Sequence, residues 1–488
     1  MKACHLAAIL VFSLLAASSR TGLAESPILV KKKVDGNYEL ECVVGKAPWG
    51  FLLFFSADEK LSEYAYLKVS ASAIELGHHH KGKSVTWRRY KPPERKLPWK
   101  VRLLKKGNFF RFRVGDRTGW IRGPSGEWLE KYEPRESWVG LKAPGETELR
   151  SMTLTTLPWL QQLTRPVIPR GPDGSFYEKQ AIPGALLKFK GKYYLYFMAG
   201  MKGNEEGSSR RSIGVATSPD MSNWKVHPAP VVKNGEPNIP HDNVYPNGAV
   251  LTPEGKIALM YSVQKYPEWV GFGLALADNP LGPFTHHEAN PVYKHFTHAH
   301  EFDLVRVDGP DYRYLLFYAG YTPKPRTGLS GDRGYLLYSD DLVNWREDKR
   351  NPVFRPETLD DWDAIHVRPR SLTKRGDTWY LWYEGCNTWK PEGSDHHGWW
   401  DTVGLARSKD LVKWEYYPRN PALPGLSIGP DRFDSKWTGW PRMRIEGETA
   451  YIFYTGNAMT GMRTIAVKDL VNWKTEGGKT LKLWPKGR

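Results

Sequence analysis

The sequence predicts an all-β protein in which a jelly-roll-like β-sandwich at residues 26–158 precedes a five-bladed β-propeller at residues 159–488. Two patterns predict this: short runs of alternating apolar and polar residues in the first part, and a composite motif that occurs five times in the second. The aromatic content, with 21 Trp, 25 Tyr and 18 Phe, suits side chains that fill the cores of β-sheets.

Residues 1–24 have the features of a secretory signal peptide. Lys2 supplies a positive charge, residues 6–17 are apolar but too short to span a bilayer, and Gly22 and Ala24 frame a small-x-small cleavage site. No later apolar run approaches the ~18 residues of a membrane span. We therefore expect a secreted or periplasmic protein with no transmembrane segment after the signal peptide is cleaved.

The first domain is predicted from residues that alternate with a period of two, as in half-buried antiparallel strands. The runs are 38–44, 51–55, 109–114 and 137–141. Residues 109–141 resemble one edge of the concanavalin-like lectin sandwiches. That resemblance implies a domain that binds carbohydrate.

The second domain is predicted from three repeated elements. The first is an aromatic and aliphatic run, found at residues 193–197, 257–261, 314–318, 379–383 and 451–454. The second is a strand and a Ser/Asp turn that end on an aromatic residue, at Trp224, Phe284, Trp345, Trp414 and Trp473, which lie 60, 61, 69 and 59 residues apart. The third is a short strand that begins at Pro183, Pro246, Asp303, Pro369 or Pro441. Single units of this size cannot bury their own faces, so radial stacking into five blades is expected.

Polar residues gather just before these five first strands, and the first strand of each propeller blade lines the central channel. The sequence therefore predicts one axial site. Its candidate residues are Glu178, His241, Asp242, His300, Glu301, Asp363, His366, Arg368, Trp437, Trp440 and Arg442.

Residues 162–473 resemble the five-bladed glycoside hydrolases of families 43, 32, 68 and 117. The resemblance rests on the five blades, on the Ser-x-Asp-Leu-x-x-Trp element and on the turn at residues 279–284. It implies that Glu301 is the general acid and that Asp242 tunes its protonation. The first-blade acid of these families is replaced by Ile182 and Pro183, so Glu178 is the nearest candidate base, with Asp363 as its rival.

The other candidates are assigned to substrate binding. His241, His300 and His366 are expected to contact sugar hydroxyls, and Arg368 and Arg442 a sugar carboxylate or sulfate. Trp437 and Trp440 are expected to stack on sugar rings. No cofactor is expected. A metal ion bound by His298 and His300, which lie on one face of a strand, is the alternative. Glu384 is interpreted as the end of a strand.

Charge suggests the kind of substrate. The formal net charge is +17, and residues 81–113 hold thirteen Lys or Arg and one acid, Glu94. In an exported protein such a surface favours an anionic polysaccharide over nucleic acid, and a solvated basic face is the alternative. The predicted function is hydrolysis of glycosidic bonds. The alternatives are a carbohydrate-binding propeller without catalysis and a sugar phosphorylase.

Overall fold

The structure is a computed structural model. It describes residues 27–35, 37–48, 50–94, 97–106, 109–122, 136–157, 165–200, 211–234, 243–265, 268–294, 299–323, 330–358, 361–387, 402–423, 433–434, 438–473 and 480–484. These residues form two compact units, one of residues 27–157 and 480–484 and the other of residues 165–473. The predicted signal peptide lies outside the described residues. No helix among those described is long and apolar enough to cross a membrane.

The first unit is a sandwich of two six-stranded sheets. The first sheet has the order β1 (Ile28–Asp35), β10 (Glu136–Lys142), β3 (Phe51–Ala57), β4 (Glu63–Val69), β5 (Ile74–His80) and β6 (Lys83–Tyr90). The second has the order β31 (Thr480–Trp484), β11 (Glu148–Thr156), β2 (Tyr38–Lys46), β7 (Trp99–Lys106), β8 (Phe109–Val114) and β9 (Arg117–Arg122). Alternation in β2 buries Tyr38, Leu40, Cys42 and Val44, as the period of two predicts.

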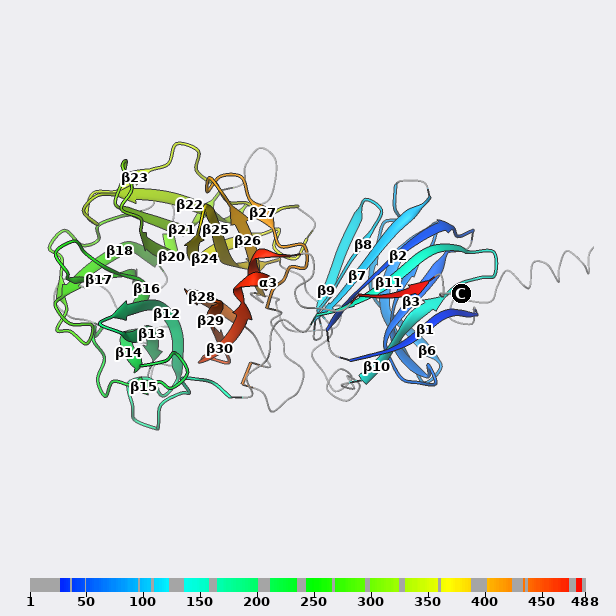
Figure 1. Ribbon diagram of the computed structural model, residues 1–488, viewed down its shortest axis with the longest axis horizontal. Coiled ribbons are helices and arrows are strands. Elements are labelled where there is room, and N and C mark those ends of the chain that lie inside the picture. Colours follow the sequence, from blue (N-terminus) through cyan, green and yellow to red (C-terminus); the bar gives the residue numbers. More distant parts are fainter. Residues whose placement is uncertain are drawn as a thin grey trace, which may run out of the picture. The chain divides into compact units, whose positions relative to one another are not determined.

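The last strand corrects the predicted domain boundary. Residues 159–488 were all assigned to the propeller, but β31 pairs antiparallel with β11, with Leu154 opposite Leu481. Figure 1 shows β31, in red, among the blue and cyan strands of the sandwich. The sandwich is therefore built from both ends of the described chain.

The second unit consists of five successive antiparallel meanders, in green to red in Figure 1. The first two are β12 (Gln180–Phe189), β13 (Lys192–Gly200), β14 (Arg211–Ser218) and β15 (Lys225–Val226), then β16 (Asn243–Leu251), β17 (Ile257–Lys265), β18 (Glu268–Ala277) and β19 (Thr285–His286). The next two are β20 (Ala299–Arg306), β21 (Tyr314–Thr322), β22 (Gly331–Ser339) and β23 (Arg346–Glu347), then β24 (His366–Arg375), β25 (Thr378–Cys386), β26 (Thr402–Ser408) and β27 (Glu415–Tyr416). The last is β28 (Thr438–Glu446), β29 (Thr449–Gly456) and β30 (Met459–Ala466), followed by the short helix α3 (Val467–Val471).

These meanders close into a ring. Each first strand contacts the first strand of the next meander, in the order β12, β16, β20, β24 and β28, and β28 returns to contact β12. Closure also uses the segment before β12, because Ile168 forms a β-bridge with Thr460 of β30. Blades one to four make the corresponding bridge from their third strand to the segment that follows in sequence, as Ile213 does with Val232. The all-β propeller fold predicted from the repeats is thus confirmed.

The repeated Ser-x-Asp turn has a local physical cause. Asp341 accepts hydrogen bonds from the backbone N–H groups of Val343 and Asn344 at 2.9 and 2.7 Å, and Trp345 Nε1 donates to the carbonyl of Leu342 at 3.0 Å. An aspartate that satisfies backbone donors two and three residues ahead fixes a tight turn. The partly buried Trp345 packs against the apolar core that includes Leu337 and Leu342.

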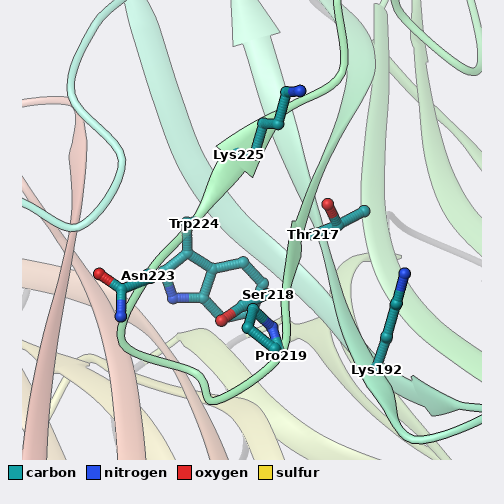
Figure 2. Close-up of a pocket in the computed structure, with 7 residues that line it drawn as sticks. All are labelled: Lys192, Thr217, Ser218, Pro219, Asn223, Trp224 and Lys225. Carbon is teal, nitrogen blue, oxygen red and sulfur yellow. The ribbon is translucent and has the colours of Figure 1, made fainter.

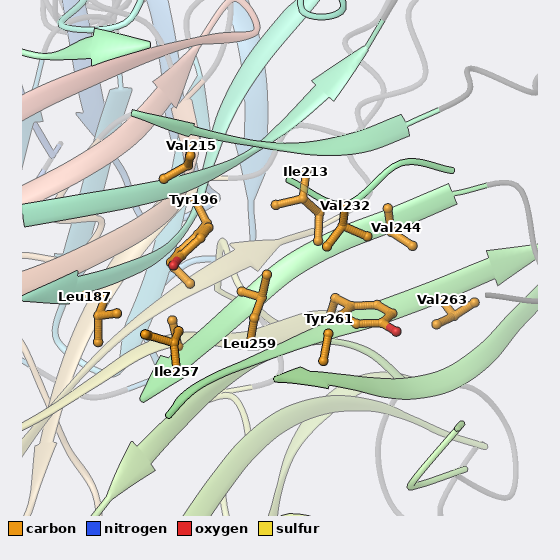
Figure 3. Close-up of a cluster of buried hydrophobic side chains, with 13 residues drawn as sticks. Leu187, Tyr196, Ile213, Val215, Val232, Val244, Ile257, Leu259, Tyr261 and Val263 are labelled. Carbon is orange, nitrogen blue, oxygen red and sulfur yellow. The ribbon is translucent and has the colours of Figure 1, made fainter. Parts of the chain in front are cut away.

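Apolar residues fill the space between blades. The core between the first and second blades includes Tyr196, Ile213, Leu259 and Tyr261, each essentially inaccessible to solvent. Figure 3 shows these side chains lying between the ribbons of the two blades. This packing holds the first strands at fixed positions around the axis, which is what a central site requires.

Candidate functional site

The first strands begin three or four residues earlier than predicted, so several candidate residues lie on the strands themselves. Each first strand also carries a shift in register, for example between Pro246 and Gly248 in β16 and between Pro369 and Ser371 in β24. Such bulges re-aim the side chain of the extra residue. Asn247 and Arg370 are the residues at these two bulges, and both are buried.

A buried charge cluster surrounds Arg370. Glu301, on β20 and 7% exposed, lies 3.0 Å from Arg370 Nη2, and the same nitrogen also donates to Glu384 Oε2 on β25. Arg370 and Glu384 have no solvent exposure. A guanidinium favours the ionised form of a carboxylate, while two carboxylates that share one positive charge oppose each other's ionisation. The cluster therefore places two carboxylates of different blades on one guanidinium.

A second pair of charges lies beside this cluster. Arg442 donates to the carbonyl of Phe302 at 3.2 Å and to Asn247 Oδ1 at 3.1 Å. Burial lowers the pKa of Arg442 to about 10, and the charge of Asp303 opposes that change. Burial raises the pKa of Asp303 to about 6, although Arg442 and the backbone N–H groups of Leu372 and Leu304 oppose the rise. Arg442 of β28 thus links β20 and β16 by hydrogen bonds.

Trp440 covers the cluster. Its ring centroid lies 4.4 Å from the Arg370 guanidinium carbon, and its backbone N–H donates to Glu384 Oε1. Its φ of 46° is in the left-handed region, where a bulky residue is an outlier that the surrounding structure must hold in place. Trp440 also packs against the apolar cluster of Ile182, Met198 and Tyr245. The structure thus places an aromatic ring on the guanidinium that binds both carboxylates.

Two further predicted residues meet at Asp332. Asp332 Oδ2 lies 2.9 Å from His366 Nδ1 and accepts a hydrogen bond from Arg368 Nε at 2.6 Å. Asp363 instead accepts a hydrogen bond from Tyr383 Oη at 2.9 Å, within its own blade. The substrate contacts predicted for His366, Arg368, Arg442 and Asp363, and the rival base role of Asp363, stay predictions.

Glu178 lies in a turn before β12. Its carboxylate accepts a hydrogen bond from the backbone N–H of Gly174 at 2.7 Å. His241, Asp242 and Trp437 lie outside the described residues, as does the side chain of His300. The roles predicted for these residues and for Glu178 stay predictions. No group of His, Cys, Asp and Glu suited to a metal ion occurs among the residues that the structure describes.

Sequence reasoning missed three members of the cluster: Asn247, Arg370 and Glu384. Glu384 was interpreted as a strand terminus, but the structure shows it within β25, completely buried and bound to Arg370. The available signal was a glutamate inside an aromatic run, since a charged residue flanked by core residues requires a partner. The arginine at a bulge carries no comparable signal.

The structure also has a surface pocket of about 410 Å³ on the first blade. Figure 2 shows that Lys192, Trp224 and Lys225 are among its lining residues. Lys192 begins β13, whereas Gly200, at the other end of that strand, pairs with Gln180 at the start of β12. Eight residue steps correspond to about 27 Å along a strand. This pocket is therefore separate from the charge cluster.

Comparisons with known proteins agree with the fold. The chain resembles a solved structure described as a glycoside hydrolase, with 14% identity over 64% of this chain and 92% of that chain and a TM-score of 0.50. A thermostable family-43 glycoside hydrolase matches with 19% identity over 59% and 88% of the chains and a TM-score of 0.44. A protein described among family-130 mannoside phosphorylases and hydrolases matches with 17% identity over 64% and 94% and a TM-score of 0.49. No protein-family model and no curated protein matches the chain. At this identity, the likeness shows the propeller fold.

Proposed function

We propose that this protein is a glycoside hydrolase whose axial charge cluster acts on a polysaccharide or oligosaccharide. The observation that carries the proposal is Glu301, a nearly buried carboxylate at the start of the third blade that contacts Arg370 beneath Trp440. The fold shared with known glycoside hydrolases supports it. Export through the predicted signal peptide suits a protein that meets such polymers outside the cytoplasm.

The chemistry requires two carboxyl groups in different states. A glycosidic oxygen leaves readily only when an acid protonates it, and a second carboxylate must stay ionised to activate water or attack the sugar. Glu301 and Glu384 share one guanidinium, so one of them can keep its proton. Glu301 is the more accessible of the two and takes the role of acid, while Glu384 tunes it. Glu178 remains the candidate for the second carboxylate, with Asp363 as its rival, and Asp242 keeps its predicted role in tuning the acid.

One observation favours a second function, namely carbohydrate binding without catalysis. The inner strand of the first blade begins with Gln180, Ala181, Ile182 and Pro183, where related hydrolases are expected to have an acid. Arg370 also neutralises part of the charge of Glu301. These two features favour a propeller that binds sugar without cleaving it.

Release of reducing sugar separates these functions. The mature protein would be incubated with neutral, uronic-acid and sulfated polysaccharides, with and without phosphate, while binding is measured by calorimetry. The hydrolase proposal predicts release that does not need phosphate. Binding without release would support the non-catalytic function, and release only with phosphate would indicate a phosphorylase.

A further inference from the structure

Three strand ends of the first blade form a row. Gln180 of β12 pairs with Gly200 of β13, and Gly200 pairs with Arg211 of β14. Residues directly opposite each other on antiparallel strands share a face of the sheet, so Gln180 and Arg211 flank Gly200 on one face. A Cβ on Gly200 would lie 2.9 Å from Gln180 Cγ and 3.0 Å from its Nε2. The Gln180 amide therefore crosses the space that glycine leaves open, toward Arg211.

Both side chains hold buried donors that no described residue satisfies. Arg211 Nε and Gln180 Nε2 are buried and have no hydrogen-bond partner in the described part of the chain. Within that same part, no carboxylate pairs with Arg211. A buried donor without a partner costs about 1–3 kcal/mol, so a ligand acceptor that satisfies it binds favourably.

The Arg211 guanidinium is nevertheless held in place. Its carbon lies 5.0 Å from the ring centroid of Tyr245, and its Nη1 donates to the Tyr245 hydroxyl. That hydroxyl in turn donates to Gln264 Oε1 at 2.5 Å. The ring and hydroxyl orient the guanidinium without neutralising its charge. Arg368 and Arg370, by contrast, are already paired with Asp332 and with Glu301 and Glu384.

A chain of contacts connects the donors with the proposed reaction centre. Tyr245, which orients Arg211, packs with Ile182 and Met198 in the apolar cluster that Trp440 contacts. Trp440 covers Arg370, the partner of Glu301. A saccharide ring beside Trp440 would thus place its substituents near the first blade.

We propose that Arg211 and Gln180 form a subsite for an anionic substituent of the saccharide, either a carboxylate or a sulfate. The guanidinium presents a fork of donors that matches two oxygens of such a group, and the Gln180 amide supplies a further donor. The inference rests on the proposed function only in placing a saccharide in the axial channel. The inference places recognition of an anionic saccharide at this edge of the first blade.

Matched ligand pairs test this subsite. Oligogalacturonate would be compared with its methyl ester, and a sulfated galactan oligosaccharide with its desulfated form, by calorimetry on the mature protein. Variants would be Arg211→Met, Arg211→Lys and Gln180→Leu. Arg346→Gln serves as the control, because Arg346 is exposed on β23 and its removal changes the net charge equally.

We expect wild type to bind one charged ligand at least about tenfold more tightly than its neutral partner. Arg211→Met should abolish that preference, Arg211→Lys and Gln180→Leu should reduce it, and Arg346→Gln should preserve it. The charged pair that shows the preference distinguishes carboxylate from sulfate.

If Arg211→Met folds poorly, a preference unchanged in Gln180→Leu and Arg211→Lys overturns the proposal. Equal binding of charged and neutral ligands by wild type overturns this inference alone, while no binding and no turnover of either overturns the proposed function as well.

Discussion

At the scale of single residues, Arg370 links two carboxylates in the channel. It pairs with Glu384, which is fully buried, and with Glu301, which is almost so. Removing one partner of a buried ion pair leaves an uncompensated charge. Arg370→Met should therefore lower the free energy of unfolding by about 3–5 kcal/mol.

Urea unfolding checks this value. Arg375→Met is the matched control, because Arg375 lies near the end of the same strand and pairs with the exposed Glu448 at 3.0 Å. An exposed pair of this kind is worth less than about 1 kcal/mol. Equal effects of the two substitutions would contradict the account of the cluster, and adding Glu384→Gln should restore part of the loss in Arg370→Met.

Asp303 gives the channel a pH-dependent contribution to stability. Burial raises its pKa from 3.8 to about 6, so between these values the folded protein holds a proton that the unfolded chain has released. Stability from this group is present below about pH 4 and is lost as pH rises through 6, by at most about 3 kcal/mol. Asp303→Asn does not titrate. The difference in unfolding free energy between wild type and Asp303→Asn should therefore fall between pH 4 and pH 7, and parallel profiles would refute this.

At the scale of elements, β31 completes the sandwich. It supplies the edge beside β11, where Thr155 Oγ1 and Thr480 Oγ1 lie 3.0 Å apart. Truncation after Glu476 should expose the β11 backbone to solvent and speed hydrogen exchange at its amides. Exchange in β24, which belongs to the other unit, should not change. Unaltered protection of β11 would show that β31 contributes nothing to the sheet.

The elements themselves were largely predictable from the sequence, but their partners were not. Alternation with a period of two located β2, β8 and β10. The apolar run at 51–55 located β3, although all seven residues of that strand are buried and do not alternate. The five repeats located the propeller strands. β31 was assigned to the wrong unit because a five-residue strand does not reveal its partner, which lies more than 300 residues earlier.

The same limit explains the candidate site. Glu301 could be found because it lies near the start of a repeated strand. Arg370 and Glu384 were missed because their contact depends on the bulge in β24, which turns Arg370 toward the axis. Arg211 was missed because its environment comes from Tyr245 in the neighbouring blade.

At the scale of the whole molecule, the propeller is an insertion in the sandwich. The chain leaves the sandwich after β11, forms the ring of five meanders and returns as β31 to pair with β11. Both units thus depend on segments that lie far apart in sequence, since Ile168 and Thr460 close the ring.

The basic run predicted to bind polyanions lies on β6 to β8 of the sandwich, with Lys83, Lys100 and Arg113 exposed.

The activity of Glu301→Gln tests the central claim most directly. The substitution keeps the size and most hydrogen bonds of Glu301 but removes its proton and charge. Its reducing-sugar release would be compared with that of wild type and of Glu446→Gln, a control on β28 whose carboxylate pairs with Lys188 at 2.8 Å. We predict that Glu301→Gln loses activity by about 10²-fold or more while it still binds the saccharide, and that Glu446→Gln is unchanged. Retention of wild-type turnover in Glu301→Gln would contradict the account.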